Sequence, residues 1–377
     1  MHSESLRSNV RLLPAVAAAV ALLAIWPRIG LADSDTGAVF VMTNQPTGNS
    51  VMVFHRDGQG MLTFVASYAS GGNGTGTGAD PLGSQGSLVL SEDQRLLFTV
   101  NAGSNSVSVF AVRGDQLKLL NTAPSGGSMP VSVAVRHDLV YVLNAGGTPN
   151  ISGLWIDPET NQLVPLAGST QNLPGGATAA PAQVSFSPDG GVLLVTEKGT
   201  NLIDTFTLDD GLAQAGVSFP SSGTTPFGFA FGRDDAAIVS DAGAGTGTAA
   251  LSSYEVRNNG DLFTVTPALG DTQSAACWVV IPRAGRIAYT SNTASGTISS
   301  YAVSDGGRLK LVSVVAASTG NGSTPIDMAL SGNSRFLYVR TAGNGGISGF
   351  RIDEDGSLTL ITSATGVPAG AQGIAAR

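Results

Sequence analysis

Apolar and polar residues alternate along most of this chain in short runs, and the runs recur in units of about fifty residues. Three of the units are Leu96–Phe110, Ile287–Tyr301 and Phe336–Phe350. Each contains an alternating run, a polar residue, a turn of Gly, Ser, Thr or Asn, and a second alternating run that ends in an aromatic residue. A period of two is typical of half-buried β-strands. The pattern therefore predicts a repeat protein in which each of seven units is one small sheet.

Turn residues divide each unit into four strands. Ser187–Gly190 and Ser331–Ser334 separate first from second strands, and Asn258–Gly260 and Glu354–Gly356 separate third from fourth strands. Asn, Asp and Gly adopt the backbone angles that hairpin turns require. The third strands end in a recurring aromatic residue: Phe54, Phe110, Trp155, Phe206, Tyr254, Tyr301 and Phe350. No segment after the leader has helical periodicity, so we predict an all-β, seven-bladed β-propeller of four-stranded antiparallel blades.

The two ends of the repeat region indicate how the ring closes. Ala38–Met42 has the pattern of a second strand, but no first strand precedes it. Gln372–Ala375 is similar to the first strands at Pro130–Val135 and Pro325–Leu330. We therefore predict that the C-terminal strand completes the first blade and removes its exposed edge. The glycine-rich Gly71–Gly78 is expected to be a surface loop between blades one and two.

Residues 1–32 have the order of a secretory signal peptide. Arg7 and Arg11 precede the apolar run Leu12–Trp26, and the small residues Gly30 and Ala32 flank Leu31 before a polar stretch. An uncleaved membrane anchor is the alternative, but no later segment is long enough to span a bilayer. We predict a signal peptide at 1–32, a propeller domain at 33–377, and a periplasmic or secreted location.

Charge and cysteine content narrow the function classes. Removing residues 1–32 leaves 16 basic and 26 acidic residues, so the formal charge moves from -8 to -10. Such a chain has no basic stripe for nucleic acid and repels polyanionic substrates. Cys277 is the single cysteine and lies in an apolar run, where we expect it to be buried packing. His55 and His137 are the two histidines after the leader, too few for a multi-histidine metal site. We expect a monomer without a cofactor.

A polar residue follows the second strand of every unit. These residues are Asn44, Asn101, Asn144, Glu197, Asp241, Asn292 and Thr341. The inner strands of a propeller converge on a central channel, so the seven residues are predicted to form a ring there. One interpretation is a site for a hard cation such as calcium, with Glu197 and Asp241 as its acids. The other is that these side chains cap strand ends and bond turn backbones.

A second predicted ring lies at the start of the first strands: Met129, Gln183, Phe227, Trp278, Asp327 and Gln372. Its aromatic and amide groups suit a small cyclic or carbohydrate-like ligand, or else they plug the channel. Glu197 is the candidate acid or base, because a carboxylate with few cations nearby has a raised pKa. Arg340 is its candidate counter-ion, with a surface salt bridge as the alternative.

The repeat resembles the seven-bladed lactonase family, which includes cytoplasmic 6-phosphogluconolactonases and carboxymuconate cyclases. Ser185–Phe206, Ala288–Tyr301 and Phe336–Ile361 carry the resemblance, which extends over residues 38–376. It implies a propeller fold and lactonase or cyclase chemistry. Of the family's catalytic positions, Glu197 matches.

Two other family positions differ. Pro181-Ala182-Gln183 stands where the family has Pro-Arg-His, and Ser291-Asn292-Thr293 where it has Ser-Asn-Arg. These changes remove the charged groups that would bind a phosphorylated lactone. The sequence therefore predicts little hydrolysis of 6-phosphogluconolactone.

Two main functional hypotheses follow, and the sequence leaves open whether the chain is an enzyme. The first is an exported lactonase-like propeller that opens or forms a small cyclic ester, with Glu197 as acid or base. Gln183, Asn144 and Asn292 would polarise the ester carbonyl. The second is a non-catalytic propeller of the cell envelope that binds a ligand or protein; a purely architectural role is a third alternative. The remaining candidate binding residues are Asp241, Trp278 and Arg340.

Overall fold

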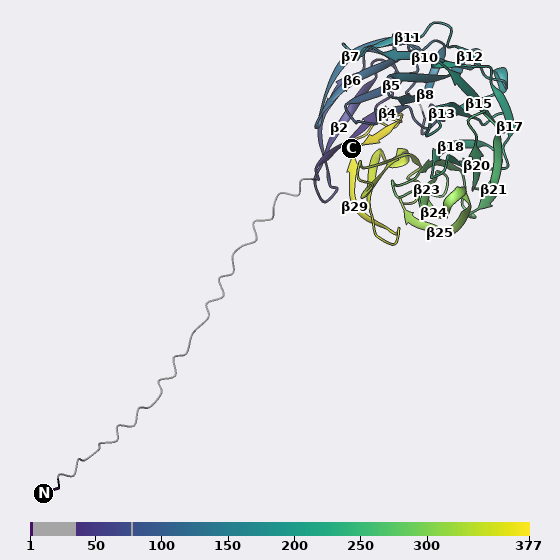
Figure 1. Ribbon diagram of the computed structural model, residues 1–377. Helices are drawn as coiled ribbons and strands as arrows, with labels where there is room; N and C mark the ends of the chain where they lie inside the picture. Colours follow the sequence, from purple (N-terminus) through teal and green to yellow (C-terminus); the bar gives the residue numbers. More distant parts are fainter. Residues whose placement is uncertain (3–34, 77) are drawn as a thin grey trace. The chain divides into compact units, whose positions relative to one another are not determined.

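The computed structural model describes residues 1–2, 35–76 and 78–377 of the chain. It divides the chain into two units, Met1–Ser34 and Asp35–Arg377. Apart from its first two residues, the expected signal peptide lies outside the described part, so the structure does not test it. The second unit is the predicted β-propeller, with seven blades arranged in a ring (Figure 1).

Each blade runs from an inner first strand to an outer fourth strand, and all strand pairs are antiparallel. The first strands are β30 (Ile374–Ala376), β4 (Leu88–Leu90), β8 (Ser128–Arg136), β13 (Pro181–Phe186), β18 (Pro226–Phe231), β22 (Ala276–Val280) and β26 (Pro325–Leu330). The second strands are β1 (Gly37–Met42), β5 (Leu96–Asn101), β9 (Leu139–Gly146), β14 (Val192–Glu197), β19 (Ala236–Asp241), β23 (Ile287–Asn292) and β27 (Phe336–Thr341).

The outer half of each blade has more variation. The third strands are β2 (Ser50–Arg56), β6 (Ser106–Arg113), β10 (Asn150–Ile156), β15 (Leu202–Asp209), β20 (Ala250–Val256), β24 (Thr297–Val303) and β28 (Gly346–Ile352). Five blades have one fourth strand each: β3 (Leu62–Ala69), β7 (Gln116–Pro124), β21 (Leu262–Gly270), β25 (Leu309–Ser318) and β29 (Leu358–Thr365). In blades 3 and 4 this strand is broken in two, as β11 (Leu163–Pro165) with β12 (Gln171–Asn172) and β16 (Leu212–Ala213) with β17 (Val217–Pro220).

The recurring third-strand aromatic residues form much of the core between strands, with one correction. Phe110, Phe206 and Tyr301 are fully buried, opposite Leu97, Leu193 and Ala288 of their second strands. In blade 3 the equivalent residue, which faces Val140 on the second strand, is Leu154 and not Trp155. Neighbouring residues of a strand face opposite sides, so Trp155 lies on the other face of the blade from Leu154, where it packs against the edge of the core and is only half-buried.

Tyrosine hydroxyls of the second strands join neighbouring blades. Tyr141, Tyr289 and Tyr338 donate hydrogen bonds to carbonyl oxygens in the third-to-fourth turn of the next blade, at 2.8, 2.7 and 2.9 Å. Their partners are Gly211, Gly356 and Gly60. Because Gly60 belongs to blade 1 and Tyr338 to blade 7, the same contact joins the last blade to the first.

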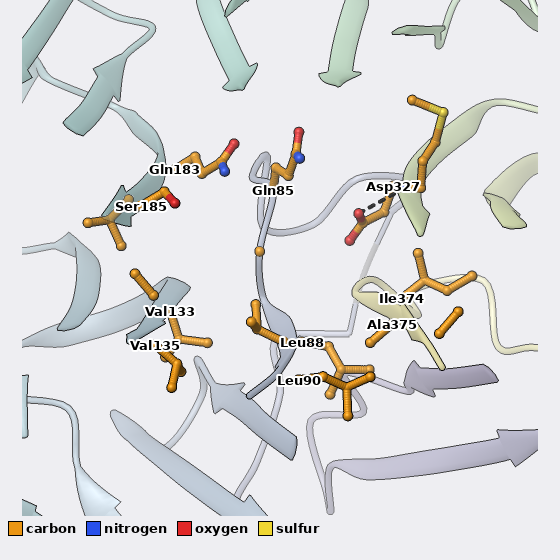
Figure 2. Close-up of a pocket in the computed structure, with 16 residues that line it drawn as sticks. Gln85, Leu88, Leu90, Val133, Val135, Gln183, Ser185, Asp327, Ile374 and Ala375 are labelled. Atoms are coloured by element: carbon orange, nitrogen blue, oxygen red, sulfur yellow. Dashed lines mark hydrogen bonds between the residues drawn. The ribbon is translucent and has the colours of Figure 1, made fainter. Parts of the chain in front are cut away.

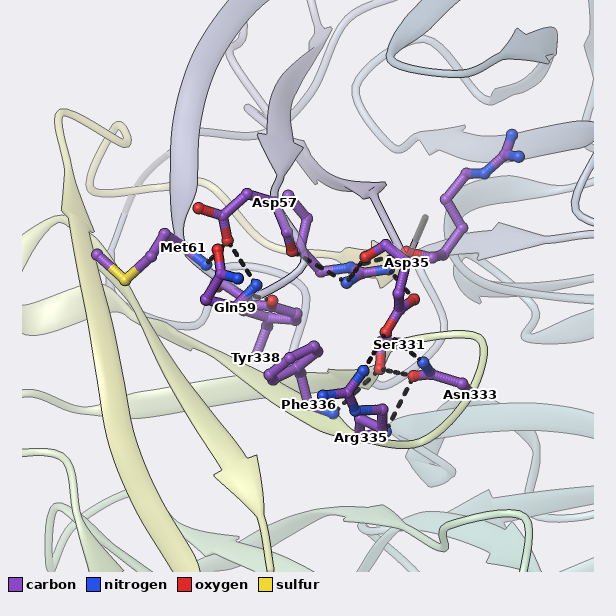
Figure 3. A network of polar contacts seen from close by, with 12 residues as sticks. Asp35, Asp57, Gln59, Met61, Ser331, Asn333, Arg335, Phe336 and Tyr338 are labelled. Atoms are coloured by element: carbon purple, nitrogen blue, oxygen red, sulfur yellow. Dashed lines mark hydrogen bonds and ion pairs between the residues drawn. The ribbon is translucent and has the colours of Figure 1, made fainter. Parts of the chain in front are cut away.

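The C-terminal strand closes the ring as predicted. β30 pairs with β1, where Phe40 lies opposite Ala375. Arg56 reinforces the closure, because its guanidinium is 2% exposed and contacts both ends of the propeller unit. It donates to the Arg377 carbonyl at 3.2 Å and pairs with the Asp35 carboxylate at 3.1 Å. Asp35 also pairs with Arg335 of blade 7 at 2.9 Å, so one network ties blade 1 to blade 7 (Figure 3).

Within the described residues the helical content is three short 3₁₀ turns, at Gly176–Thr178, Asp305–Gly307 and Ala342–Asn344. None of the described helices is long or apolar enough to cross a membrane.

Candidate functional site

The polar residues that follow the second strands are buried, and apart from Thr341 their side chains bond the hairpin of their own blade or loops beside it. Asn292 donates to the hydroxyls of Thr297 and Ser299 at 3.2 and 2.8 Å. Asn144 donates to the Ser125 carbonyl and the Asn150 side chain, both at 3.0 Å. The amide oxygens of Asn292 and Asn144 have no hydrogen-bond partner in the described structure. These contacts are those of strand-end caps.

Glu197, at the end of β14, is also buried and hydrogen-bonded to neighbouring backbone and side-chain groups. Its carboxylate is fully buried, accepts the Gly175 backbone N–H at 3.1 Å, and accepts the Thr200 hydroxyl at 2.5 Å. A Cβ atom added at Gly175 would lie 1.9 Å from Glu197 Oε2, so the loop backbone packs directly on the carboxylate. Glu197 is therefore enclosed by its hairpin and by the loop that enters blade 4.

A second carboxyl group, Asp204 on β15, lies against Glu197. Its Oδ1 atom accepts the Ser218 hydroxyl at 2.6 Å, while Oδ2 has no partner apart from the neighbouring acid. Burial, together with the contact to Glu197, raises the pKa of Asp204 to about 8. The sequence did not identify Asp204 as a candidate. It occupies a third-strand position at which other blades have a serine, such as Ser108, Ser252 and Ser299.

Asp241 and Glu197, the two acids proposed for a cation site, have separate partners. Asp241 accepts hydroxyls from Ser252 and Ser221, and burial raises its pKa to about 7. Among the described residues, no group of three or more His, Cys, Asp or Glu side chains is arranged to hold a metal ion.

Arg340 does not act as a counter-ion to Glu197, which corrects that expectation. Its fully buried guanidinium donates to four backbone carbonyls. They belong to Thr341, Gly346, Pro368 and Ala369. Burial lowers the pKa of Arg340 to about 10. In the described part of the chain, no ion pair involves Glu197.

The segment 79–87, between blades 1 and 2, enters the centre of the ring, a feature that sequence inspection missed. Ser84 donates to the Val131 carbonyl of blade 3, and its own carbonyl accepts Trp278 Nε1 of blade 6 at 3.0 Å. The Gln85 side chain bonds both backbone groups of Val279. We call segment 79–87 the axial segment, because it contacts blades on several sides of the axis.

Trp278 and Lys198 hold the axial segment in place. The Trp278 ring is fully buried and lies 5.0 Å from the Phe227 ring, centroid to centroid. Lys198 donates to the Gly83 carbonyl and lies over the Phe227 ring. Trp278 thus contributes packing around the axial segment.

The leucine at position 82, which is buried, was the one sequence signal that this stretch is more than a surface loop.

A cavity of about 320 Å³ lies beside the axial segment among the first strands. Its polar side chains gather toward one end, and apolar side chains line the other (Figure 2). The polar end comprises Gln85, Gln183, Ser185 and Asp327. The apolar end comprises Leu88, Leu90, Val133, Val135, Ile374 and Ala375. We call this hollow the axial cavity.

Of the candidate site residues that the sequence predicts, Gln183 is the one that lines the axial cavity. Its amide bonds the backbone of Phe229, donating at 3.0 Å and accepting at 2.7 Å. Asp327 occupies the matching place in blade 7, two residues after the proline that begins the strand. The described lining of the cavity does not include Glu197, Asn144, Asn292, Asp241, Trp278 or Arg340.

Asp327 is the one titratable residue in the described lining of the axial cavity. Its side chain is 3% exposed, and burial raises its pKa to about 8 even though the backbone N–H of Met328 donates to it at 2.9 Å. Its φ of 69° is in the left-handed region that non-glycine residues rarely adopt. A cavity, a buried acid and local backbone strain commonly coincide at functional sites.

No protein-family model and no curated sequence matches this chain significantly. Solved structures match it over 89% of its length. One is a protein from Bacteroides uniformis described provisionally as a 6-phosphogluconolactonase, with 19% identity, a TM-score of 0.68 and 98% of that chain covered. Another is the periplasmic gluconolactonase of Pseudomonas aeruginosa, with 19% identity, a TM-score of 0.67 and 98% covered. The chain therefore has the fold of these lactonase-type propellers, as the resemblance of its repeat implies.

Proposed function

We propose that this protein is a lactonase-like propeller that binds a small, uncharged cyclic ester in the axial cavity and hydrolyses it slowly. The observation that carries this proposal is Asp327, a buried acid at the polar end of an otherwise uncharged cavity. Gln183 and Gln85 support it, because each side-chain amide uses one N–H on a backbone carbonyl and has a second N–H for a ligand oxygen.

In the proposed reaction, Asp327 moves the protons. Its carboxylate takes a proton from a water molecule whose oxygen adds to the ester carbonyl carbon. The ring C–O bond then breaks, and Asp327 returns the proton to the departing alkoxide. Because the pKa of Asp327 is raised to about 8, the base form increases between pH 7 and 8, and the rate is expected to rise over this interval.

The proposed substrate is uncharged because the described lining of the axial cavity contains no lysine or arginine. A phosphate group brought there would lose its hydration without gaining a cationic partner. We therefore expect no appreciable hydrolysis of 6-phosphogluconolactone.

Binding without turnover is the second candidate, and the position of Glu197 favours it. The sequence assigns Glu197 as acid or base, but that carboxylate is enclosed by Gly175 and Thr200. If Asp327 only orients a ligand, the protein is a binding propeller. We also propose export to the periplasm or outside the cell, supported by the order of residues 1–32 and by the periplasmic neighbour from Pseudomonas aeruginosa.

The test measures binding and hydrolysis of glucono-1,5-lactone and 6-phosphogluconolactone by the wild type, Asp327→Asn and Glu197→Gln. We expect turnover of the neutral lactone alone, reduced about a hundredfold by Asp327→Asn and retained by Glu197→Gln. Thermal melting checks that both variants fold.

The remaining outcomes separate the candidates. Saturable binding without turnover, weakened by Asp327→Asn, would support the binding propeller. Turnover that is lost in Glu197→Gln and kept in Asp327→Asn would return the site to Glu197. No binding of any neutral lactone would overturn the proposal.

A further inference from the structure

Trp155 occupies a third-strand position at which the other blades have no large aromatic residue. Each third strand has a recurring buried residue opposite the second strand, such as Leu154 in blade 3, and the residue directly after it lies on the other face of the blade. In the other six blades that next residue is small, polar or charged: His55, Ala111, Thr207, Glu255, Ala302 and Arg351. Blade 3 alone places a large aromatic residue there, and the indole remains half-buried. A partly exposed tryptophan loses favourable burial and commonly marks a binding surface.

The indole forms part of a hollow of about 310 Å³ between blades 3 and 4. Its lining side chains are Arg136, His137, Asp138, Leu139, Trp155, Phe186 and Leu208, and Gly190, Gly191 and Gly211 complete the lining. We call it the Trp155 hollow. It is separate from the axial cavity, because the two share no lining residue.

The walls of the Trp155 hollow are held rigidly. The Tyr141 hydroxyl donates to the Gly211 carbonyl and accepts the Ala213 N–H, both at 2.8 Å, which fixes the turn beside the indole. A Cβ atom added at Gly211 would lie 3.4 Å from the Trp155 ring, and one added at Gly190 would lie 2.2 Å from Arg136 Nε. Glycine at 190 therefore leaves Arg136 its space, Gly211 packs at van der Waals distance from the indole, and both glycines have a left-handed φ near 80°.

Polar groups at the hollow are available to a ligand. His137 and Asp138 form the exposed first-to-second turn of blade 3, and His137 has a left-handed φ of 50°. The guanidinium of Arg136 has one weak ion pair, with Glu92 at 3.9 Å. Beside the indole there are thus planar donors and a carboxylate acceptor within one small hollow.

We propose that the Trp155 hollow binds one pyranose ring of a neutral carbohydrate. The C–H groups on one face of a pyranose carry partial positive charge and stack on the negative face of an aromatic ring. Its hydroxyl groups both donate and accept, which suits Asp138, Arg136 and His137 together. An acidic sugar is disfavoured, because Asp138 and Glu92 lie nearby and the chain after residue 32 carries a formal charge of -10.

Trp155 also provides the readout. Trp278 is the other tryptophan of the propeller unit and is fully buried, so saccharides can change the exposure of Trp155 alone. The full-length mature protein would be titrated with maltotriose, cellotriose, chitotriose and trigalacturonate, following tryptophan fluorescence and the heat of binding. We expect saturable binding of at least one neutral trisaccharide at concentrations up to about 10 mM, and none of trigalacturonate.

Two variants and one control variant assign the site. Trp155→Ala should weaken binding about tenfold or more, while Phe64→Ala, which removes an exposed aromatic ring on blade 1, should leave it unchanged. Asp138→Asn, which keeps the fold of an exposed turn, should weaken it as well. The proposal is overturned if no neutral trisaccharide binds, if trigalacturonate binds better, or if binding survives Trp155→Ala but is lost in Asp327→Asn.

Discussion

Glu197 and Asp204 give blade 4 a buried pair of carboxyl groups where other blades use a hydroxyl. Asn101 and Asn292 each donate a hydrogen bond to a serine hydroxyl of the third strand, and Asp241 accepts a hydrogen bond from the Ser252 hydroxyl. In blade 4 the partner is a second acid, and both members of the pair are fully buried. Burial and the contact with Glu197 favour the neutral form of Asp204, so the pair holds a proton on Asp204 at neutral pH in the folded protein.

This pair predicts a loss of stability toward alkaline pH. The pKa of Asp204 is raised in the folded state, so its contribution is complete below its ordinary pKa of 3.8 and is lost as pH rises toward 8. Asp204→Asn keeps a neutral side chain at every pH. We expect its free energy of unfolding to decline less than that of the wild type, by roughly 3–4 kcal/mol between about pH 5 and pH 8, as measured by urea denaturation.

Asp209→Asn is the matched control, because Asp209 is an exposed acid of the same strand. It should leave the pH dependence as it is in the wild type. A wild-type protein whose stability is constant over this pH interval would contradict the shared-proton interpretation of the pair.

At the level of single residues, the candidate site could be predicted only in part from the sequence. The sequence places Gln183 and Asp327 at equivalent positions of two first strands, and both line the axial cavity. It also favours Glu197, but a sequence cannot show that the Gly175 backbone covers that carboxylate. The wrong pairing of Arg340 has the same cause: the residue next to it follows the repeat, but two of the four carbonyls that it binds, those of Pro368 and Ala369, lie in the loop after β29.

Among the elements, the strands were predictable because a single pattern recurs seven times. Alternation, hairpin turns and the C-terminal match specify the blades and their closure. The repeat does not specify its exceptions. It does not indicate the broken outer strands of blades 3 and 4. The insertion of segment 79–87 beside the axis depends on contacts with residues far away in sequence, such as Trp278.

The contacts of the closing strand β30 predict how its deletion changes the stability of the propeller. Deleting Gln372–Arg377 removes the β1–β30 pairing, the Gln372 bonds to segment 79–87 and the Arg377 carbonyl that Arg56 binds. The deletion leaves the inner edge of β1 unpaired and the Arg56 guanidinium partly unsatisfied, so we expect a melting temperature lower by about 5 °C or more, with aggregation. Differential scanning calorimetry and size-exclusion chromatography would measure both effects.

Removing Arg377 alone separates the two contributions, because it keeps the residues of the β1–β30 pairing but removes the carbonyl that Arg56 binds. A deletion of six residues that melts like the parent and elutes as a single species of the same size would mean that β30 contributes little to closure.

For the whole molecule, the propeller unit begins where the predicted leader ends. Asp35 is the first residue of that unit and is held by ion pairs to Arg56 and Arg335. Intact-mass measurement of the exported protein should therefore find an N-terminus near Asp33. Protein that retains Met1 in the membrane fraction would instead support an uncleaved anchor, and cytosolic protein with Met1 would contradict export.

The Arg56 contact also constrains when the molecule can become complete. Arg56 and Arg377 are 321 residues apart in sequence. A chain that emerges N-terminus first presents β1 early, but the partner of its inner edge emerges last. Contacts of this sequence separation form slowly, and unpaired strand edges recruit other chains. Closure of the ring therefore waits for β30, and a copy that lacks this strand would expose an unpaired edge of β1 that the closed ring covers.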